Sequence, residues 1–451
     1  MTRRSDRDEA SATGGKPPKG ACFVDHPLRS ALIEEVHARP FAALEPPVQA
    51  SHLALVSGEH GAADDFAHLV RLCQRYGLSP PTEGSTHFTC DFGTFRLKWE
   101  RHGEFCTYTF FCQNPSEQPF ALPAILTVPR DWLEALPGER LVAVHIAVDL
   151  RNRPPPSAVD LATIFESETV SGSRVFGGAA LTWTDFAVHE DGFGRILVRD
   201  ISLDHFEVGR LVQRLLEIET YRMMALVALP LVREHGPQIS LIEEETAQIA
   251  RSMSEIAGLD DTRALLTRIS RLSADVEGIT ARLSYRIDAT RAYYALVRRR
   301  VERLREERLE RLQTIEEFME RRLAPAVQTC ETAARRLESF SRRLARASNL
   351  LRTQVDVALQ EQNRDLLLSM DRRARLQSRL QRILEVISIV ALTYYLAVLL
   401  TTILKAVKTA GVPLNVDLVT GAATPFLLAI IWLGVRWTRR AVVRRHEKDL
   451  D

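Results

Sequence analysis

Charged and imidazole side chains gather in a short stretch near the start of the sequence. Between Ala21 and Pro40, ACFVDHPLRSALIEEVHARP, the candidate ligand-binding side chains are His26, Arg29, Glu35, His37 and Arg39. Imidazole, carboxylate and guanidinium groups bind a metal or an anion when a fold brings them together. The same residues also fit the charged face of a short surface helix, where ion pairs contribute little stability. His26, Glu35 and His37 would further suit the acid-base chemistry of a hydrolase.

A second group of candidate anion-binding residues precedes the glycine pair Gly177-Gly178. Ser173 and Arg174 supply a hydroxyl and a guanidinium in the run SGSRVFGGAAL. The glycine pair lacks the GxGxxG and GK[ST] spacings of phosphate loops, and it opens a strand instead of a helix. A glycine turn or bend in a sheet is therefore the favoured interpretation. Ser173 and Arg174 remain candidates for binding an anion near that turn.

Hydroxyl side chains recur within an uncharged stretch near the end of the sequence. They are Thr393, Tyr394, Thr401 and Thr402. Residues seven or eight apart share one face of a helix, so some of these hydroxyls form a stripe. Such a stripe would line a pore if several copies of the helix met around it. A divalent cation is the expected cargo under that alternative.

No familiar catalytic arrangement is present in the sequence. It contains no HExxH, no GxSxG, no phosphate loop and no Cys/His pair at usable spacing. Its six cysteines include no CxxC pair, which fits reduced cytosolic thiols better than a zinc site or a disulfide framework. The net charge of +1 gives no signal for nucleic acid. We therefore predict a protein that is not an enzyme, has no cofactor and has no nucleic-acid partner.

The elements that must position these residues follow a polar tail, residues 1–20, which we expect to be disordered. Residues 21–235 predict a cytoplasmic α/β domain. Its expected strands are 52–57, 86–99, 104–112, 141–150 and three within 171–201, and its expected helices are 61–76, 131–136 and 206–229. Asp191-Gly192 is the clearest signal of a hairpin. The domain is expected to end at three helix-breaking residues: Pro230, Gly236 and Pro237.

Residues 239–385 are almost entirely helix-forming and predict a coiled-coil stalk. Apolar residues recur there in steps of three and four, which is typical of a coiled-coil seam: Leu265, Ile269, Leu272, Val276, Ile279, Leu283, Ile287, Tyr294, Val297, Val301 and Leu304. The charged run from Arg298 to Arg311 fits a solvated helix surface. Pro325 removes a backbone donor, so the helix must kink or turn there, and we favour a turn that folds the stalk into two antiparallel helices. The second of these would continue into the membrane.

Two uncharged runs near the C-terminus predict a membrane hairpin. Residues 386–404 and 418–435 approach the length needed to cross a hydrocarbon core of about 30 Å, and residues 405–417 form the loop between them. Arginines precede the first run and fill the basic tail 436–451, whereas the loop holds few charges. By the positive-inside rule both termini are cytoplasmic. The overall prediction is an α+β fold with a sheet domain, a helical stalk and a two-helix transmembrane hairpin.

Five blocks of sequence resemble the bacterial membrane-anchored proteins grouped as domain of unknown function 3422. They are HPLRSALIEEVHARPF (26–41), GSRVFGGAALTWTDFAVHEDGFGRILV (172–198), GRLVQRLLEIETYRMMALVALP (209–230), FMERRLAPAVQTC (318–330) and LLRTQVDVALQEQNRDLLLSMDRRARLQSRLQ (350–381). The resemblance covers the chain from about residue 22. It implies a protein of the bacterial inner membrane with no established activity, and it supplies no catalytic residues.

The order of the parts is also similar to that of the CorA-type magnesium channels. That resemblance implies a homopentamer whose first span lines a pore and is followed by a Gly-Met-Asn signature. Here the first span ends in TTIL and continues as KAV, so the signature is absent. Likeness of layout is an analogy and does not establish function.

Two functional hypotheses follow. The first is a membrane-anchored cytoplasmic scaffold that binds a ligand or a partner protein. It would lie on the lipid bilayer and form a homo-oligomer through its stalk and membrane helices. The alternative is a CorA-like cation channel or transporter without the usual selectivity signature. The scaffold is favoured because that signature and every catalytic motif are missing from the sequence.

Overall fold

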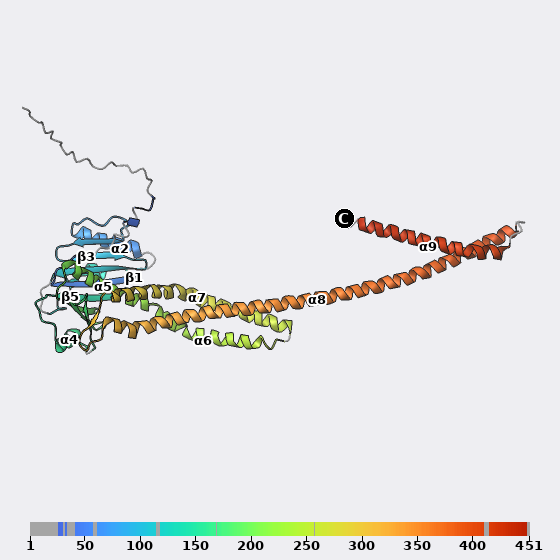
Figure 1. Cartoon of the computed structure of the whole chain (residues 1–451). Coiled ribbons are helices and arrows are strands. Elements are labelled where there is room, and N and C mark those ends of the chain that lie inside the picture. Colours follow the sequence, from blue (N-terminus) through green and yellow to red (C-terminus); the bar gives the residue numbers. More distant parts are fainter. Residues whose placement is uncertain are drawn as a thin grey trace, which may run out of the picture. The chain divides into compact units, whose positions relative to one another are not determined.

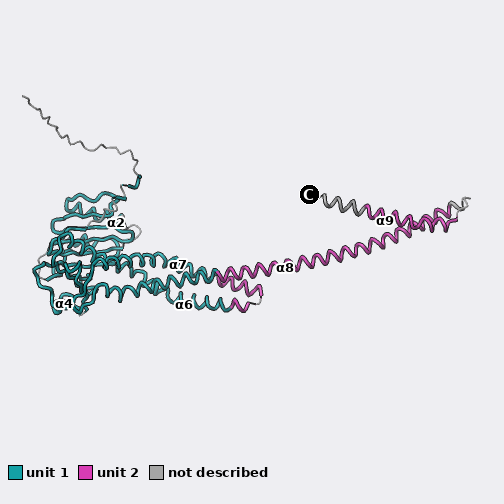
Figure 2. Tube along the Cα trace, in the orientation of Figure 1, with its two compact units in different colours: residues 1–251, 270–345 teal, residues 252–269, 346–451 magenta. Residues whose placement is uncertain are grey.

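The structure is a computed structural model that describes residues 26–29, 32–33, 41–56, 61–113, 118–167, 169–256, 258–409 and 415–448. Contacts divide the chain into two compact units, which Figure 2 shows in different colours. Unit 1 comprises Met1–Arg251 and Ser270–Ala345, and unit 2 comprises Ser252–Ile269 and Arg346–Asp451. The sheet and the candidate site belong to unit 1.

Unit 1 is organised around a nine-stranded mixed sheet (Figure 1). The strand order is β2-β3-β4-β1-β5-β8-β7-β6-β9, with β5 parallel to β8 and the other described pairs antiparallel. The strands are β1 (Val48–Val56), β2 (His87–Asp91), β3 (Arg96–Arg101), β4 (Phe105–Gln113), β5 (Glu139–Asp149), β6 (Ser171–Val175), β7 (Ala180–Thr184), β8 (Gly194–Asp200) and β9 (Glu307–Arg308). This sheet, followed by long helices, confirms the predicted α+β class.

Helices pack on both faces of the sheet. One face buries apolar side chains against α2 (Gly61–Arg75), η1 (Ala124–Thr127), α3 (Arg130–Glu134) and α4 (Ala158–Phe165). The other face packs against α5 (His205–Leu226) and against residues of α7 (Leu259–Glu302) and α8 (Ile315–Thr409). A buried, capped α5 agrees with the predicted helix 206–229. Its N-terminus is closed by a capping box between Asp204 and Glu207.

Alternation along the strands decides which side chains face α5. In β3, Leu97 and Trp99 are fully buried in the cluster that contains α2. Since successive side chains of a strand point to opposite faces, Lys98 and Glu100 lie on the α5 side. Thr109 in the neighbouring β4 does the same. The strand pattern therefore places polar residues beneath α5.

The predicted strand 86–99 consists of two strands. A turn containing Gly93, at φ +85°, separates β2 from β3. The carboxylate of Asp91 accepts a hydrogen bond from the Gly93 amide at 2.8 Å, which stabilises the turn. Phe92 and Phe95 stack with ring centroids 4.9 Å apart. These two aromatic residues gave the turn the composition of a strand, which is why the prediction missed it.

The expected helix breaks are wrong. Pro325 lies inside α8, and the turn between the long helices is residues 303–314. Proline has no amide hydrogen, so the carbonyl four residues before Pro325 lacks its usual partner in the helix. Because Pro325 is exposed, water can hydrate that carbonyl. The Thr329 hydroxyl also donates to the Pro325 carbonyl at 2.9 Å. The three residues expected to end the domain all lie inside α6 (Ala228–Ser252): Pro230, Gly236 and Pro237.

The charged run from Arg298 to Arg311 is not one helix surface. Helix α7 ends within it, and β9 follows as the edge strand that pairs with β6. Two backbone hydrogen bonds fasten the connection to the β6 region: Gly172 N to Gln313 O at 2.9 Å and Phe176 N to Leu304 O at 2.8 Å. The paired helices α7 and α8 are thereby joined to the sheet at their connection.

The predicted apolar seam is buried. Apart from the half-buried Tyr294, each of its residues is at most 7% exposed: Leu265, Ile269, Leu272, Val276, Ile279, Leu283, Ile287, Val297, Val301 and Leu304. In unit 1, α8 buries a stripe with similar spacing: Leu323, Val327, Cys330, Leu337, Phe340 and Leu344. Helix pairing thus accounts for the periodicity of the sequence, while coiled-coil supercoiling stays a prediction.

Unit 2 contains two helices long and apolar enough to cross a membrane. They are the C-terminal part of α8 and α9 (Val416–Lys448), which contain the predicted runs 386–404 and 418–435. Large apolar side chains on both are exposed, with Tyr395 at 70% and Phe426 at 72%. Exposed apolar surface of this kind is what lipid contact requires.

Candidate functional site

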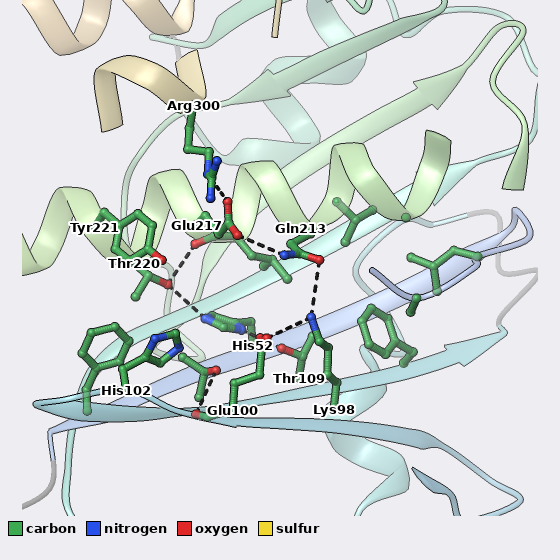
Figure 3. Close-up of a pocket in the computed structure, with 18 residues that line it drawn as sticks. His52, Lys98, Glu100, His102, Thr109, Gln213, Glu217, Thr220, Tyr221 and Arg300 are labelled. Atoms are coloured by element: carbon green, nitrogen blue, oxygen red, sulfur yellow. Dashed lines mark hydrogen bonds and ion pairs between the residues drawn. The ribbon is translucent and has the colours of Figure 1, made fainter. Parts of the chain in front are cut away.

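A cavity opens between the sheet and α5 in unit 1 (Figure 3). Its volume is about 250 Å³. Residues of β1, β3 and β4 form one side, residues of α5 form the other, and Arg300 from the last turn of α7 lies at the edge. The cavity therefore lies where three parts of the fold, far apart in sequence, come together.

The polar residues of the cavity stand on a sheet face whose central strand β5 buries only apolar side chains. Elsewhere on this face Val144, Ile146 and Val198 are at most 2% exposed and pack in the cluster that contains α5. Beneath the middle of α5, the same face of the sheet carries His52 and Lys98, which are only 4% and 6% exposed. Burying polar groups costs free energy unless each is hydrogen-bonded. A polar patch in this place exceeds what packing of the fold requires.

His52 joins the sheet to α5 through both of its ring nitrogens. Its Nδ1 lies 2.8 Å from Thr109 Oγ1, and its Nε2 lies 3.0 Å from Thr220 Oγ1. The Thr220 hydroxyl donates its proton to the Leu216 carbonyl at 2.8 Å. Thr220 Oγ1 therefore accepts from the Nε2–H of His52, and Nδ1 accepts from Thr109. Both nitrogens of a neutral imidazole are satisfied.

Burial keeps His52 neutral. The pKa of the imidazole is lowered from 6.5 to about 3, mainly by burial, and the electrostatic effects of His102 and Lys98 act in the same direction. A neutral ring with both nitrogens occupied has no free lone pair to take a proton from a substrate. His52 consequently organises the cavity wall and is not placed as a general base.

A chain of polar contacts runs from Lys98 across the cavity. It includes three further charged side chains and one amide. Lys98 Nζ lies 3.2 Å from Glu100 Oε1 and donates to Gln213 Oε1 at 3.4 Å. Gln213 Nε2 donates to Glu217 Oε1 at 3.0 Å, and Glu217 forms an ion pair with Arg300. The chain of contacts links β3, α5 and the end of α7. Every fixed charge in it has a partner of opposite sign.

Lys98 is unusual for this sequence because it is the only lysine between Lys19 and Lys405, where all other fixed cations are arginines. An ammonium group carries three donors around a point charge, whereas a guanidinium is a flat fork. Glu100 and Gln213 occupy two of the Lys98 donors. Among the described residues the third donor has no partner, and it belongs to a side chain that borders a cavity.

Gly209 allows the segment before β1 to cross directly over α5. A Cβ at this position would lie 1.8 Å from the carbonyl oxygen of Ala42. The Leu44 amide donates to the His205 carbonyl at 2.9 Å and holds the crossing in place. Because Ala42 and Leu44 both line the cavity, this close approach forms part of its wall.

The substitution Gly209→Ala is expected to lower the free energy of unfolding by about 2 kcal/mol, because the backbone at Ala42 must move to admit a methyl group. Urea unfolding followed by tryptophan fluorescence measures the change. Gly236→Ala is the matched control, since a Cβ at Gly236 meets nothing within 4 Å and that residue lies inside α6. The control should leave stability unchanged or raise it by up to ~1 kcal/mol. Equal effects of the two substitutions would contradict the role given to Gly209.

Most of the predicted N-terminal binding residues lie outside the part of the chain that the structure describes. His26 and Arg29 are described and exposed, and His26 Nδ1 accepts a hydrogen bond from the Leu28 amide at 3.2 Å. Neither of the two lines the cavity. The remaining three lie outside the described residues: Glu35, His37 and Arg39. Ligand binding by this group stays a prediction.

Ser173 and Arg174 lie in β6, and the structure gives Ser173 a different partner from an anion. Its hydroxyl is fully buried and donates to Glu306 Oε1 at 2.5 Å. The same carboxylate accepts from the Ile315 amide at 3.1 Å and the Glu316 amide at 2.8 Å, so it caps the first turn of α8. Burial raises the pKa of Glu306, and the three donors partly oppose that change. Anion binding by Ser173 and Arg174 stays a prediction.

The predicted pore-facing hydroxyls of α8 differ in exposure. Thr393 is 4% exposed and Thr401 is half-buried, whereas Tyr394 is 66% exposed and Thr402 is exposed. Each of the three threonine hydroxyls donates to the carbonyl four residues earlier in its own helix. Their hydroxyl protons are thus used within the helix, and a pore-lining role stays a prediction.

Sequence reasoning missed the cavity residues altogether. The segment FRLKWE alternates apolar and polar residues, which is ordinary for a strand with one solvated face. One signal was present, namely the isolated lysine in a chain that otherwise uses arginine. Among the described residues no three His, Cys, Asp or Glu side chains gather in a way that could hold a metal. The donor set of the cavity instead suits an organic ligand.

The chain matches the model of a known protein family. A family model described as Protein of unknown function (DUF3422) matches residues 24–442, nearly the whole chain. The matched region contains the sheet, the long helices and both helices able to cross a membrane. A search of curated proteins gave no match.

Proposed function

The chain belongs to the DUF3422 family, and we propose that it is a membrane-anchored protein whose sheet domain binds a small polar ligand in the cavity beneath α5. The observation that carries the proposal is Lys98, a buried cation with an unfilled donor at the edge of a 250 Å³ cavity. The surrounding groups favour binding over catalysis. His52 is saturated with hydrogen bonds, and the carboxylates of Glu100 and Glu217 are each paired with a cation.

A thermal-shift survey of polar metabolites tests the proposal on the full chain in detergent. A ligand present at a hundred times its Kd stabilises the folded protein by about 2.7 kcal/mol, which is a readily measured rise in Tm. We expect at least one metabolite to raise the Tm of the wild type and to have no effect on Lys98→Met. Glu83→Gln, on an exposed turn, is the control and should respond as the wild type does. A survey in which no compound stabilises the wild type would overturn the proposal.

Membrane anchoring is supported by the two long apolar helices of unit 2. Five arginines precede the first apolar run, Arg372, Arg373, Arg375, Arg379 and Arg382, and a basic segment follows the second. This distribution supports insertion in the bacterial inner membrane with both termini in the cytoplasm. A C-terminal reporter that is active only in the periplasm should therefore remain inactive, and an active one would reverse the orientation.

Self-association is supported by an apolar stripe on the part of α8 that precedes the membrane. We call it the stalk stripe, and its members are 44–64% exposed: Leu359, Leu366, Met370, Leu376, Leu380 and Leu384. Their spacing places them along one side of the helix, which also carries Arg373, seven residues after Leu366 and seven before Leu380. The opposite side carries arginines throughout this segment, so the stripe cannot be submerged in lipid: Arg364, Arg372, Arg375, Arg379 and Arg382.

A second copy of the chain is the partner that fits the stalk stripe. The stripe and the first membrane run belong to one helix, so two copies in one bilayer present identical stripes at the same height. Burying the exposed half of one such side chain contributes about 1 kcal/mol, and six from each helix contribute on the order of 12 kcal/mol. This is comparable with the association cost, which is about 4–15 kcal/mol. Because both copies are inserted in one bilayer with the same orientation, the homo-oligomer that the stripe supports is parallel.

Replacing Leu366 and Leu380 together by Asp is expected to convert the oligomer to monomer in mild detergent, because four charges would face one another in a dimer. Light scattering of the detergent complex measures the mass. Leu368→Asp is the control, since Leu368 is 48% exposed but lies outside the stripe, and it should keep the wild-type mass. A wild-type mass equal to that of one chain would remove the self-association proposal.

A further inference from the structure

The fixed charges that line the cavity cancel. The side chains of fixed charge there are two cations, Lys98 and Arg300, and two anions, Glu100 and Glu217. His52 is neutral and adds no charge. A ligand with a net charge would bring an uncompensated charge into this largely buried space, which is costly. A ligand without net charge fits the electrostatics better.

An unfilled donor and an unfilled acceptor lie side by side in the cavity. Lys98 has one free N–H among the described residues, and the carboxylate of Glu100 contacts only Lys98 there. Both side chains project from β3 on the same face, two residues apart in the strand. A carboxylate of the ligand would accept from Lys98, while an ammonium of the same ligand would donate to Glu100. One molecule that carries both groups satisfies both sites.

Part of the remaining wall is apolar, and the volume bears on the ligand's size. Leu44, Val212 and Leu216 line the cavity on the side of α5 and the segment that crosses it, and Phe111 lines it from β4. A cavity of about 250 Å³ is at the small end of the range for ligand pockets. A free amino acid with an apolar side chain is a ligand of suitable size.

Resting on the proposed binding function, we propose that the ligand is a small zwitterion of the amino-acid type with an apolar side group. Its carboxylate binds Lys98, its ammonium binds Glu100, and its side group packs on Val212 and Leu216. The existing contact between Lys98 and Glu100, at 3.2 Å, holds the two binding groups ready for the ligand's opposite charges. Binding of a zwitterion leaves the balance of fixed charges in the cavity unchanged.

Isothermal titration of the full chain in detergent tests this assignment with matched compounds. The series comprises leucine and phenylalanine, their amides, which carry only the positive charge, and their N-acetyl derivatives, which carry only the negative charge. An uncharged polyol of similar size completes it. We expect one zwitterion to bind at least tenfold more tightly than either of its singly charged analogues.

Two near-isosteric substitutions locate the binding groups. Lys98→Met removes the partner of the ligand's carboxylate and should weaken the zwitterion at least tenfold while weakening the amide less. Glu100→Gln removes the partner of the ammonium and should weaken the zwitterion while weakening the N-acetyl compound less. Circular dichroism and elution volume identify any variant that fails to fold, and Glu83→Gln serves as the exposed control.

The outcomes separate this inference from the proposed function. If an anion, a cation or a polyol binds through Lys98 while no zwitterion binds, the ligand assignment fails and the binding function stands. Equal binding of a zwitterion and its two analogues also overturns the assignment. If no compound of this series or of the metabolite survey binds, both proposals fail.

Discussion

Lowering the pH from 7.5 to 5 is expected to reduce the free energy of unfolding by roughly 4 kcal/mol through two buried histidines, His52 and His145. Burial lowers the pKa of His52 from 6.5 to about 3 and that of His145 from 6.5 to about 4. His145 is 1% exposed, stacks on Phe193 with ring centroids 4.0 Å apart, and contacts Ser51 at 2.9 Å. Because both side chains are buried, water solvates a protonated ring poorly at either position.

The sign follows from the two pKa values of each group. Below pH 6.5 the unfolded chain takes up a proton on each imidazole, and the folded chain does not until the lower pKa is reached. Stability is therefore full above pH 6.5 and falls by about 1.4 kcal/mol per unit and per histidine below it, or ~2 kcal/mol each at pH 5. The loss is complete near the folded pKa values of about 3 and about 4.

Difference measurements isolate these histidines from the other groups that titrate. Urea unfolding at pH 7.5 and at pH 5 should show that His52→Gln and His145→Gln each lose ~2 kcal/mol less than the wild type over this interval. His87→Gln is the control because His87 is exposed on β2, and its loss should match that of the wild type. An unchanged pH dependence in the His52 variant would falsify the assigned neutral state.

The substitution Glu306→Ala is expected to lower the free energy of unfolding by about 3 kcal/mol. Its carboxylate is the common acceptor for the Ser173 hydroxyl and for the first amides of α8, at Ile315 and Glu316. Removing it leaves the buried Ser173 hydroxyl without its acceptor and removes a helix cap. Because burial already raises the pKa of Glu306, part of the carboxylate's stabilisation is offset, which keeps the expected loss moderate.

Urea unfolding of Glu306→Ala beside Glu307→Ala measures this effect. Glu307 is the next residue in the chain and is exposed in β9, so its removal should change stability by less than about 0.5 kcal/mol. Hydrogen exchange at the start of α8 should also accelerate in the Glu306 variant, since the capped amides open first. If both variants retained wild-type stability, the contacts of the Glu306 carboxylate with Ser173 and with the start of α8 would not stabilise the fold.

Elements whose formation depends on a local pattern of apolar residues were predicted from the sequence. The apolar periodicity of 206–229 predicted α5, and the spacing from Leu265 to Val301 predicted a buried seam on α7. The turn at Gly93 was missed because Phe92 and Phe95 look like strand residues. The tolerance of Pro325 within α8 depends on its exposure, which no local rule supplies.

Nonlocal contacts explain the features that the sequence could not disclose. The two-residue strand β9 exists only because β6 offers it an edge, and its residues Glu307 and Arg308 have no strand signal of their own. The cavity brings together His52, Lys98 and Gln213, which become neighbours only through the strand order and the crossing of α5. The residue types of His52 and Lys98 are ordinary for the polar face of a strand, and that of Gln213 is ordinary for the polar side of a helix.

The isolated lysine of the cavity also makes the molecule its own reporter in limited proteolysis. A protease that cleaves only after lysine has a single target between Lys19 and Lys405, and that target, Lys98, is 6% exposed within the third strand of the sheet. Cleavage there requires β3 to open, so the rate of appearance of two fragments measures the free energy of that opening. Anything that occupies the cavity slows the cut, and no label has to be introduced to see it.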